Sequence, residues 1–76
     1  MGKISVVLNA SLRKYSTKSE FEREIEAPVS IREIAKNLRI PDDELGLLVV
    51  DDTICSLDSL VQNGQILKLF PPLGGG

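Results

Sequence analysis

Alternating apolar and polar residues predict two strands in the first third of the chain. The first covers residues 3–9, and its apolar face is formed by Ile4, Val6 and Leu8. β-Branched residues suit such a pleated strand. The second covers residues 20–26, where four glutamates alternate with Phe21, Arg23 and Ile25. Residues 10–19 are polar and basic without a sustained period, so we expect a loop that joins the strands into an antiparallel hairpin with one solvated face.

A helix is predicted after Pro28, which has no N–H to donate and therefore ends the second strand. Ser30 and Glu33 fit a capping box, in which the serine oxygen accepts from the N–H three residues on and the glutamate reaches back. The apolar residues that follow recur at helical spacing and are Ile31, Ile34, Ala35 and Leu38. They form one stripe for burial, and we expect Pro41 to stop the helix after about ten residues.

The second half of the chain predicts two more strands. Residues 47–50 form a continuous apolar run, LLVV, which is typical of a strand covered on both faces. The Asn-Gly pair at 63–64 is a strong turn signal, because glycine adopts a positive φ without penalty, and residues 65–70 follow it as a last strand. Between these strands we expect Leu57 and Leu60 to lie on a single helical turn under the sheet.

This order of elements predicts an α+β fold, in which a mixed sheet packs on one main helix and leaves its other face to solvent. A chain of 76 residues supports one domain at most. We place it at residues 1–70, followed by an extended, flexible C-terminal glycine tail at residues 71–76. The predicted core residues are Ile4, Val6, Leu8, Ile31, Ile34, Leu38, Leu48 and Val50.

Composition excludes several classes of protein. The chain has no histidine and one cysteine, Cys55, so a metal cluster and histidine-based catalysis are excluded. A net charge of −2 and three aromatic residues argue against nucleic-acid binding. No apolar run approaches the roughly 18 residues of a membrane span, and no apolar signal segment precedes the first strand. We therefore expect a cytoplasmic protein that is not bound to a membrane.

The charges are distributed unevenly along the chain. Residues 1–39 carry eight of the nine Lys and Arg residues against five acids, whereas residues 40–76 carry one lysine against six acids. If the fold separates these charges, the C-terminal half offers a negative face to a basic partner. An evenly solvated surface is the alternative.

The end of the chain carries its most conspicuous chemistry. Pro71 and Pro72 favour an extended path that holds the following residues away from the body. Six extended residues reach about 20 Å, and three glycines form a thread without side chains that could enter a narrow channel. The terminal carboxylate is ionised at neutral pH. The alternatives are a frayed terminus or a linker remnant.

Residues 63–76, NGQILKLFPPLGGG, resemble the ending of the ubiquitin-like β-grasp sulfur carriers. That family includes the small subunit of molybdopterin synthase and the thiamine-biosynthesis sulfur carrier. The resemblance covers the whole chain in element order, and residues 30–76 most specifically. It implies a β-grasp fold and a carrier that is not itself an enzyme, although it could be the small subunit of a synthase.

The resemblance also implies a site at the tail. Gly76 would be adenylated and converted to a thiocarboxylate, and Gly74 and Gly75 would thread into the partner. The residues expected to contact partners are Phe70, Pro71, Pro72 and Leu73. Two partners are implied, a ubiquitin-activating-type adenylyltransferase that uses ATP and a synthase subunit that accepts the sulfur. The chain itself would bind no cofactor or metal and would be a monomer when free.

Several alternatives stay open. The proline pair and the length favour the molybdopterin branch, whereas a triple-glycine ending is also familiar among thiamine-type carriers. A ubiquitin-like modifier that is conjugated to lysines through Gly76 would use the same activated terminus. A plain interaction domain without chemistry at its tail is the third possibility. Tyr15 could contact a partner from its basic loop, although a solvated loop is the simpler interpretation.

Overall fold

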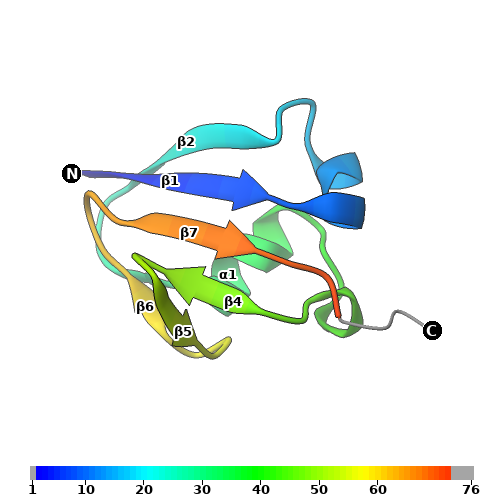
Figure 1. Cartoon of the computed structure of the whole chain (residues 1–76). Coiled ribbons are helices and arrows are strands. Elements are labelled where there is room, and N and C mark those ends of the chain that lie inside the picture. The colour runs from blue at the N-terminus through cyan, green and yellow to red at the C-terminus, as the bar shows by residue number, and fades with distance from the viewer. Residues whose placement is uncertain (1, 73–76) are drawn as a thin grey trace.

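The computed structural model of the chain describes residues 2–72. One main sheet dominates these residues (Figure 1). Its strands lie in the order β2 (Glu20–Ile25), β1 (Gly2–Leu8), β7 (Ile66–Leu69), β4 (Leu48–Val50) and β5 (Thr53–Cys55). The remaining elements are the strand pair β3 (Val29–Ser30) and β6 (Leu60–Val61), the helix α1 (Ile31–Asn37), and the 3-10 helices η1 (Ala10–Tyr15) and η2 (Asp42–Glu44).

The sheet is mixed, as the order of elements predicts. β1 is antiparallel to β2, which confirms the hairpin, and it is parallel to β7. β4 is antiparallel to both β7 and β5. Helix α1 lies against one face of the sheet (Figure 1). The expected mixed sheet on one main helix is therefore confirmed, and β7 occupies its centre.

The core lies between α1 and the sheet. Its buried hydrophobic residues are Ile4, Val6, Leu8, Leu12, Ile31, Ile34, Ala35, Ile40, Leu48, Val50, Val61, Leu67 and Leu69. Every predicted core residue is among them except Leu38, which is partly buried and packs against the cluster. The prediction of the core from alternation and from the helical stripe is therefore confirmed, with Leu38 at its margin.

Helix α1 begins as predicted and ends earlier than predicted. The Ser30 hydroxyl accepts a hydrogen bond from the Glu33 N–H at 3.1 Å. The helix ends at Asn37, and Arg39 adopts a left-handed backbone with a φ of 64°. The Ile40 N–H then bonds back to the carbonyl oxygen of Ala35 at 2.9 Å. The expectation that Pro41 stops the helix is wrong, because the chain has already left the helical path two residues before it.

Three local predictions are also wrong. The loop expected at residues 10–19 contains η1, whose Leu12 is fully buried and so adds to the core. The run at 47–50 is covered on one face only, since Leu47 is 41% exposed. Leu60 lies in β6 and is 56% exposed, so it is not placed under the sheet, although the Ser59 N–H closes a turn on the carbonyl oxygen of Ser56 and Leu57 packs against the core. Backbone pairing of β6 with β3 holds Leu60 in an extended conformation instead.

Ion pairs connect the two oppositely charged halves of the chain. Arg32 contacts Asp42 at 2.9 Å and Asp58 at 3.3 Å, and Lys14 contacts Glu44 at 3.3 Å. These contacts neutralise part of the negative charge that the C-terminal half would otherwise present. Among residues 2–72, no helix is long and apolar enough to cross a membrane.

Candidate functional site

The tail leaves the domain from the central strand. β7 ends at Leu69, but its pairing with the segment before β4 continues for one more residue. The Phe70 N–H donates to the carbonyl oxygen of Leu47 at 3.0 Å, and the Gly46 N–H donates to that of Phe70 at 2.8 Å. Pro71 has no N–H and cannot extend the ladder. The chain therefore departs from the sheet at a defined point, close to η2 (Figure 1).

The predicted site residues divide into two groups. Phe70 and Pro71 are half-buried and Pro72 is exposed, so these three lie together where the chain leaves the sheet. The other predicted residues, Leu73, Gly74, Gly75 and Gly76, lie outside the described residues. The assignment of the reactive carboxylate to Gly76, and the division of the chain at residue 70, both stay predictions.

An apolar surface adjoins this exit point on the sheet face turned away from α1, which we call the open sheet face. The strand registers place Val7, Lys68, Val49 and Ile54 in one row across it. Strand alternation puts Leu47 and Phe70 on the same face. Ile54 is 72% exposed, and Leu47 and Ile66 are each about 40% exposed. Apolar side chains left in water on one face are typical of a protein interaction site.

An acidic strip borders the open sheet face. Glu20, Glu22 and Glu24 alternate along β2 and are exposed. Their register partners on β1 are Val7, Ser5 and Lys3, and the Lys3 ammonium lies 3.6 Å from the Glu22 carboxylate. The face thus combines apolar side chains grouped around Lys68 with an acidic edge that favours a basic partner.

Two charged contacts hold η2 in place beside the exit point. Arg32 of α1 bonds to the Asp42 carboxylate, and Lys14 of η1 lies beside Glu44. A hydrogen bond to Glu44 raises the pKa of Tyr15 to about 12, with smaller contributions from burial and from the negative charges of Glu44 and Asp43. The same bond lowers the pKa of Glu44, with help from Lys14. Tyr15 is half-buried at the end of η1 and packs against the core, so it does not lie in a solvated loop.

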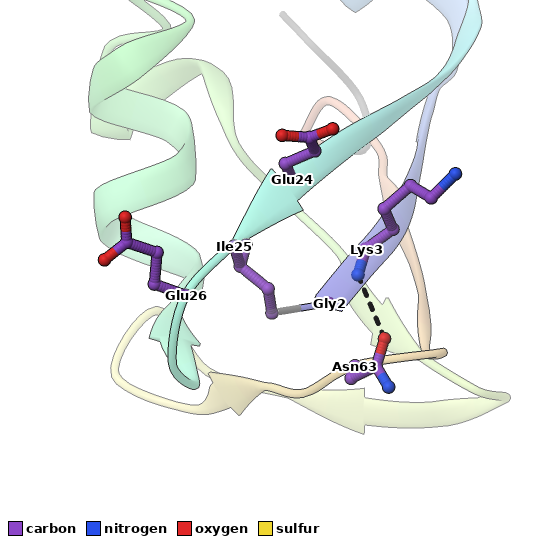
Figure 2. Close-up of a pocket in the computed structure, with 6 residues that line it drawn as sticks. All are labelled: Gly2, Lys3, Glu24, Ile25, Glu26 and Asn63. Carbon is purple, nitrogen blue, oxygen red and sulfur yellow. Dashed lines mark hydrogen bonds between the residues drawn. The ribbon is translucent and has the colours of Figure 1, made fainter.

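A surface hollow lies at the other end of the sheet from the exit point. Figure 2 shows the six residues that line it, Gly2, Lys3, Glu24, Ile25, Glu26 and Asn63. The Lys3 N–H donates to the Asn63 side-chain oxygen at 2.9 Å. A Cβ at Gly2 would come within 2.6 Å of that oxygen, so Asn63 closes directly over the first strand. The contact of Asn63 with Gly2 and Lys3 therefore closes the end of the first strand, and we assign this hollow a structural role.

The described residues hold no other concentration of reactive groups. Between residues 2 and 72, no group of three or more Cys, Asp or Glu side chains is placed to hold a metal ion. Cys55 is half-buried, packs against the core, and directs its sulfur to the carbonyl oxygen of Thr53 at 3.4 Å. It behaves as a small packed hydrophobe.

Sequence reasoning missed two parts of this region. Leu47 and Val49 were expected to be buried by elements on both faces of their strand. Ile54 belongs to β5, a strand that alternation did not predict. Gly46 was not singled out, although it bonds to Phe70 beside the exit point. A glycine directly before an apolar strand, in a position without a turn motif, was the signal available for it.

Comparison with known proteins places the chain in a family. A model described as the ThiS family matches residues 6–76. A search of curated protein sequences found no match to the chain.

Solved structures with the same fold are similar over nearly the whole chain. A Pyrococcus furiosus protein assigned as molybdopterin converting factor subunit 1 has a TM-score of 0.77 and 17% identity, with 96% of this chain and 100% of that one covered. The small archaeal modifier protein 1 of Haloferax volcanii has a TM-score of 0.76 and 16% identity, with the same coverage.

A third similar structure is a complex. It joins subunits 1 and 2 of the molybdopterin-converting factor from Helicobacter pylori 26695, with a TM-score of 0.63, 15% identity, and coverage of 97% of this chain and 99% of that one. At these identities the likeness shows the fold. It confirms the expected ubiquitin-like β-grasp architecture.

Proposed function

This chain belongs to the ThiS family, and from that premise we propose that it is a sulfur carrier that works through the carboxylate of Gly76. The observation that carries the proposal is the exit of the chain from the central strand beside an open apolar sheet face. A partner that docks on this face receives the tail from a fixed point. The domain would bind the partner, and the reacting group would lie at the end of the tail.

The chemistry requires activation because a carboxylate is a poor electrophile. A carboxylate oxygen of Gly76 would attack the α-phosphorus of ATP and release pyrophosphate, leaving an acyl-adenylate. A sulfur nucleophile such as hydrosulfide would then attack the acyl carbon, and AMP would leave with the bonding electrons. The product is a thiocarboxylate. A glycine acyl carbon has no side chain to hinder this attack.

The activating machinery would belong to a separate protein. Phosphoryl chemistry needs a phosphate-binding loop and a metal site, and neither is found in residues 2–72. We therefore propose a ubiquitin-activating-type adenylyltransferase as the partner that binds ATP, and a synthase subunit as the acceptor of sulfur. The Helicobacter pylori complex of converting-factor subunits 1 and 2 supports the second partner. This chain would bind no cofactor and would act in the cytoplasm as a carrier.

The open sheet face is the surface we propose for docking of the activating enzyme. Ile54, Ile66 and Leu47 would bury their exposed apolar surface on it, and Phe70 and Pro71 would continue the contact toward the tail. The glutamates of β2 would meet basic groups at the edge of the complex, which raises the association rate more than the affinity.

Conjugation to other proteins is the second candidate function. The likeness to a small archaeal modifier protein favours it, since both outcomes begin with the same activated terminus. A lysine amine would then replace the sulfur nucleophile at the acyl carbon.

One experiment separates these functions. The full chain is incubated with its activating enzyme, ATP and sulfide, and its intact mass is measured. A gain equal to the mass difference between sulfur and oxygen supports the carrier. Adducts with the mass of whole proteins, formed in a lysate, support the modifier. A chain lacking Gly75 and Gly76 is the control, and its activation at the wild-type rate would refute both proposals.

A further inference from the structure

Among the described residues, Gly46 makes the last backbone hydrogen bond to the C-terminal segment before Pro71. Its N–H donates to the carbonyl oxygen of Phe70 at 2.8 Å, one step beyond the bond from Phe70 to Leu47. Pro71 and Pro72 follow and can donate no backbone hydrogen bond. The path of the tail at residues 71–72 is therefore set by Gly46 and by van der Waals contact with it.

Close contact explains why position 46 is a glycine. A Cβ built there would lie 2.5 Å from the Cα of Pro72, 2.6 Å from the carbonyl oxygen of Pro71 and 2.7 Å from its carbonyl carbon. All three are backbone atoms, so no change of side-chain rotamer would relieve the overlap. The tail itself would have to move away by about 1 Å to restore ordinary contact distances.

Gly64 shows the opposite reason for a glycine. It adopts a φ of 86°, and a Cβ there would meet nothing within 4 Å. Gly46 is not among the described residues with a positive φ. Gly64 thus supplies a backbone conformation, whereas Gly46 supplies room for residues 71 and 72.

The segment that leads into Gly46 is anchored to α1, to η1 and to the core. Asp42 is held by Arg32 of α1 at 2.9 Å, and Glu44 lies 3.3 Å from Lys14 of η1. The Leu45 N–H bonds to the carbonyl oxygen of Asp42 at 3.1 Å, and the Leu45 side chain packs against the core. A segment held in this way cannot easily yield, so an added methyl group at 46 would displace the tail.

We propose that Gly46 is a positioning residue, which fixes the direction in which Pro71 and Pro72 lead out of the sheet toward the tail. The inference rests on the proposed function, since direction matters only if the terminus must reach a reagent in a docked partner. Misplacement of a reacting group by about 1 Å can reduce a rate by about 100-fold, which sets the upper limit of the effect when the shift begins at Pro72. A change at Gly46 would therefore lower kcat more than it raises KM, because it shifts Pro71 and Pro72 and leaves Ile54, Ile66 and Leu47 of the docking face in place.

The test compares Gly46→Ala with Gly64→Ala in the full chain. The rate of adenylation by the activating enzyme is measured from the release of pyrophosphate. The temperature is chosen so that melting curves show both variants folded. We expect Gly46→Ala to lower kcat by about 10- to 100-fold with KM within about twofold of wild type. Gly64→Ala is expected to lower the melting temperature through backbone strain and to leave kcat and KM unchanged.

The outcomes distinguish this inference from the proposed function. An inactive wild-type chain refutes the proposed function itself. An active wild type with wild-type kcat in Gly46→Ala overturns the positioning role, as does a rise in KM at unchanged kcat. An equal loss of kcat in Gly64→Ala assigns the effect to stability and also overturns it.

A second variant decides the question if Gly46→Ala fails to fold. Pro72→Ala changes an exposed position, where it restores an N–H and frees φ, so the domain stays folded while the tail's path is loosened. A lowered kcat at unchanged KM supports the positioning of the tail by this segment. Wild-type kcat overturns it, whether KM is unchanged or raised.

Discussion

Ile66 and Leu67 are neighbours on β7 whose side chains lie on opposite faces of the sheet. Leu67 is fully buried, and its register partners Val6 and Val50 are buried too. Leu67→Ala leaves a cavity beneath the central strand, so we expect it to lower the free energy of unfolding by about 2–5 kcal/mol. A domain of this length is stabilised by about 4–11 kcal/mol in total. The variant should therefore lose a large share of its stability.

Ile66→Ala should cost much less. Ile66 is 42% exposed on the open sheet face, and complete burial of such a side chain is worth about 1.5–3 kcal/mol. We therefore expect a loss of about 1 kcal/mol. Both substitutions replace a good strand former by alanine at adjacent positions, so the small loss in strand propensity is shared and cancels in the comparison.

Urea denaturation at equilibrium measures both free energies of unfolding. If Leu67→Ala is too unstable to give a folded baseline, Leu67→Val provides a milder cavity at the same site. Ile66→Ala should in addition raise the KM for the activating enzyme, because it removes apolar surface from the proposed docking face. Equal losses of stability in the two alanine variants would refute the assignment of the faces.

Four further predictions concern the contact between Tyr15 and Glu44, the helix and the tail. The absorbance of Tyr15, the only tyrosine in a chain without tryptophan, should titrate near pH 12, and Glu44→Gln should move the midpoint toward 10; a wild-type midpoint at 10 would contradict the contact. Because folding lowers the pKa of Glu44, its contribution to stability should be present above its unfolded pKa of about 4.5 and lost as the pH falls through the lower folded value. Folding raises the pKa of Tyr15, so its contribution should be present below about pH 10 and lost by about pH 12, and melting curves against pH measure both effects. Leu38→Ala should cost about 1–2 kcal/mol in urea denaturation, since Leu38 is only partly buried; a loss below about 0.5 kcal/mol would place it outside the helical stripe. Gly75→Val should leave the melting temperature unchanged and slow ATP-dependent activation, since it adds a branched side chain to the proposed thread; activation at the wild-type rate would count against threading.

The strongest local patterns were enough to predict the frame of the fold. Strict alternation assigned residues to the buried and exposed faces of β1 and β2, because successive side chains of a strand point to opposite sides. The serine cap and the spacing of Ile31 and Ile34 located α1. The resemblance of the C-terminal residues pointed to the family that the match over residues 6–76 confirms.

Other local patterns were ambiguous. The run at 47–50 fits a strand with two covered faces as well as one with a single covered face, since hydrophobicity alone does not say whether a partner lies above it. Helix α1 ended early because Arg39 adopts a left-handed backbone, and no glycine marked the position. Leu12 was hidden in a polar segment, where one buried side chain produces no period.

The sequence by itself determined the strands β1, β2, β4 and β7, the start of α1 and most of the core residues that these elements supply, and it pointed to the glycine ending as the place of the chemistry, which stays a prediction. Only the tertiary structure decided that β7 lies at the centre of the sheet, that apolar residues from β1, β7, β4 and β5 form one open face, and that Gly46 lies against Pro71 and Pro72. The physical reason is that these relations join residues far apart in the chain. Local periodicity records the side of an element that is buried, but the packing of one element on another follows from long-range pairing that no single segment encodes.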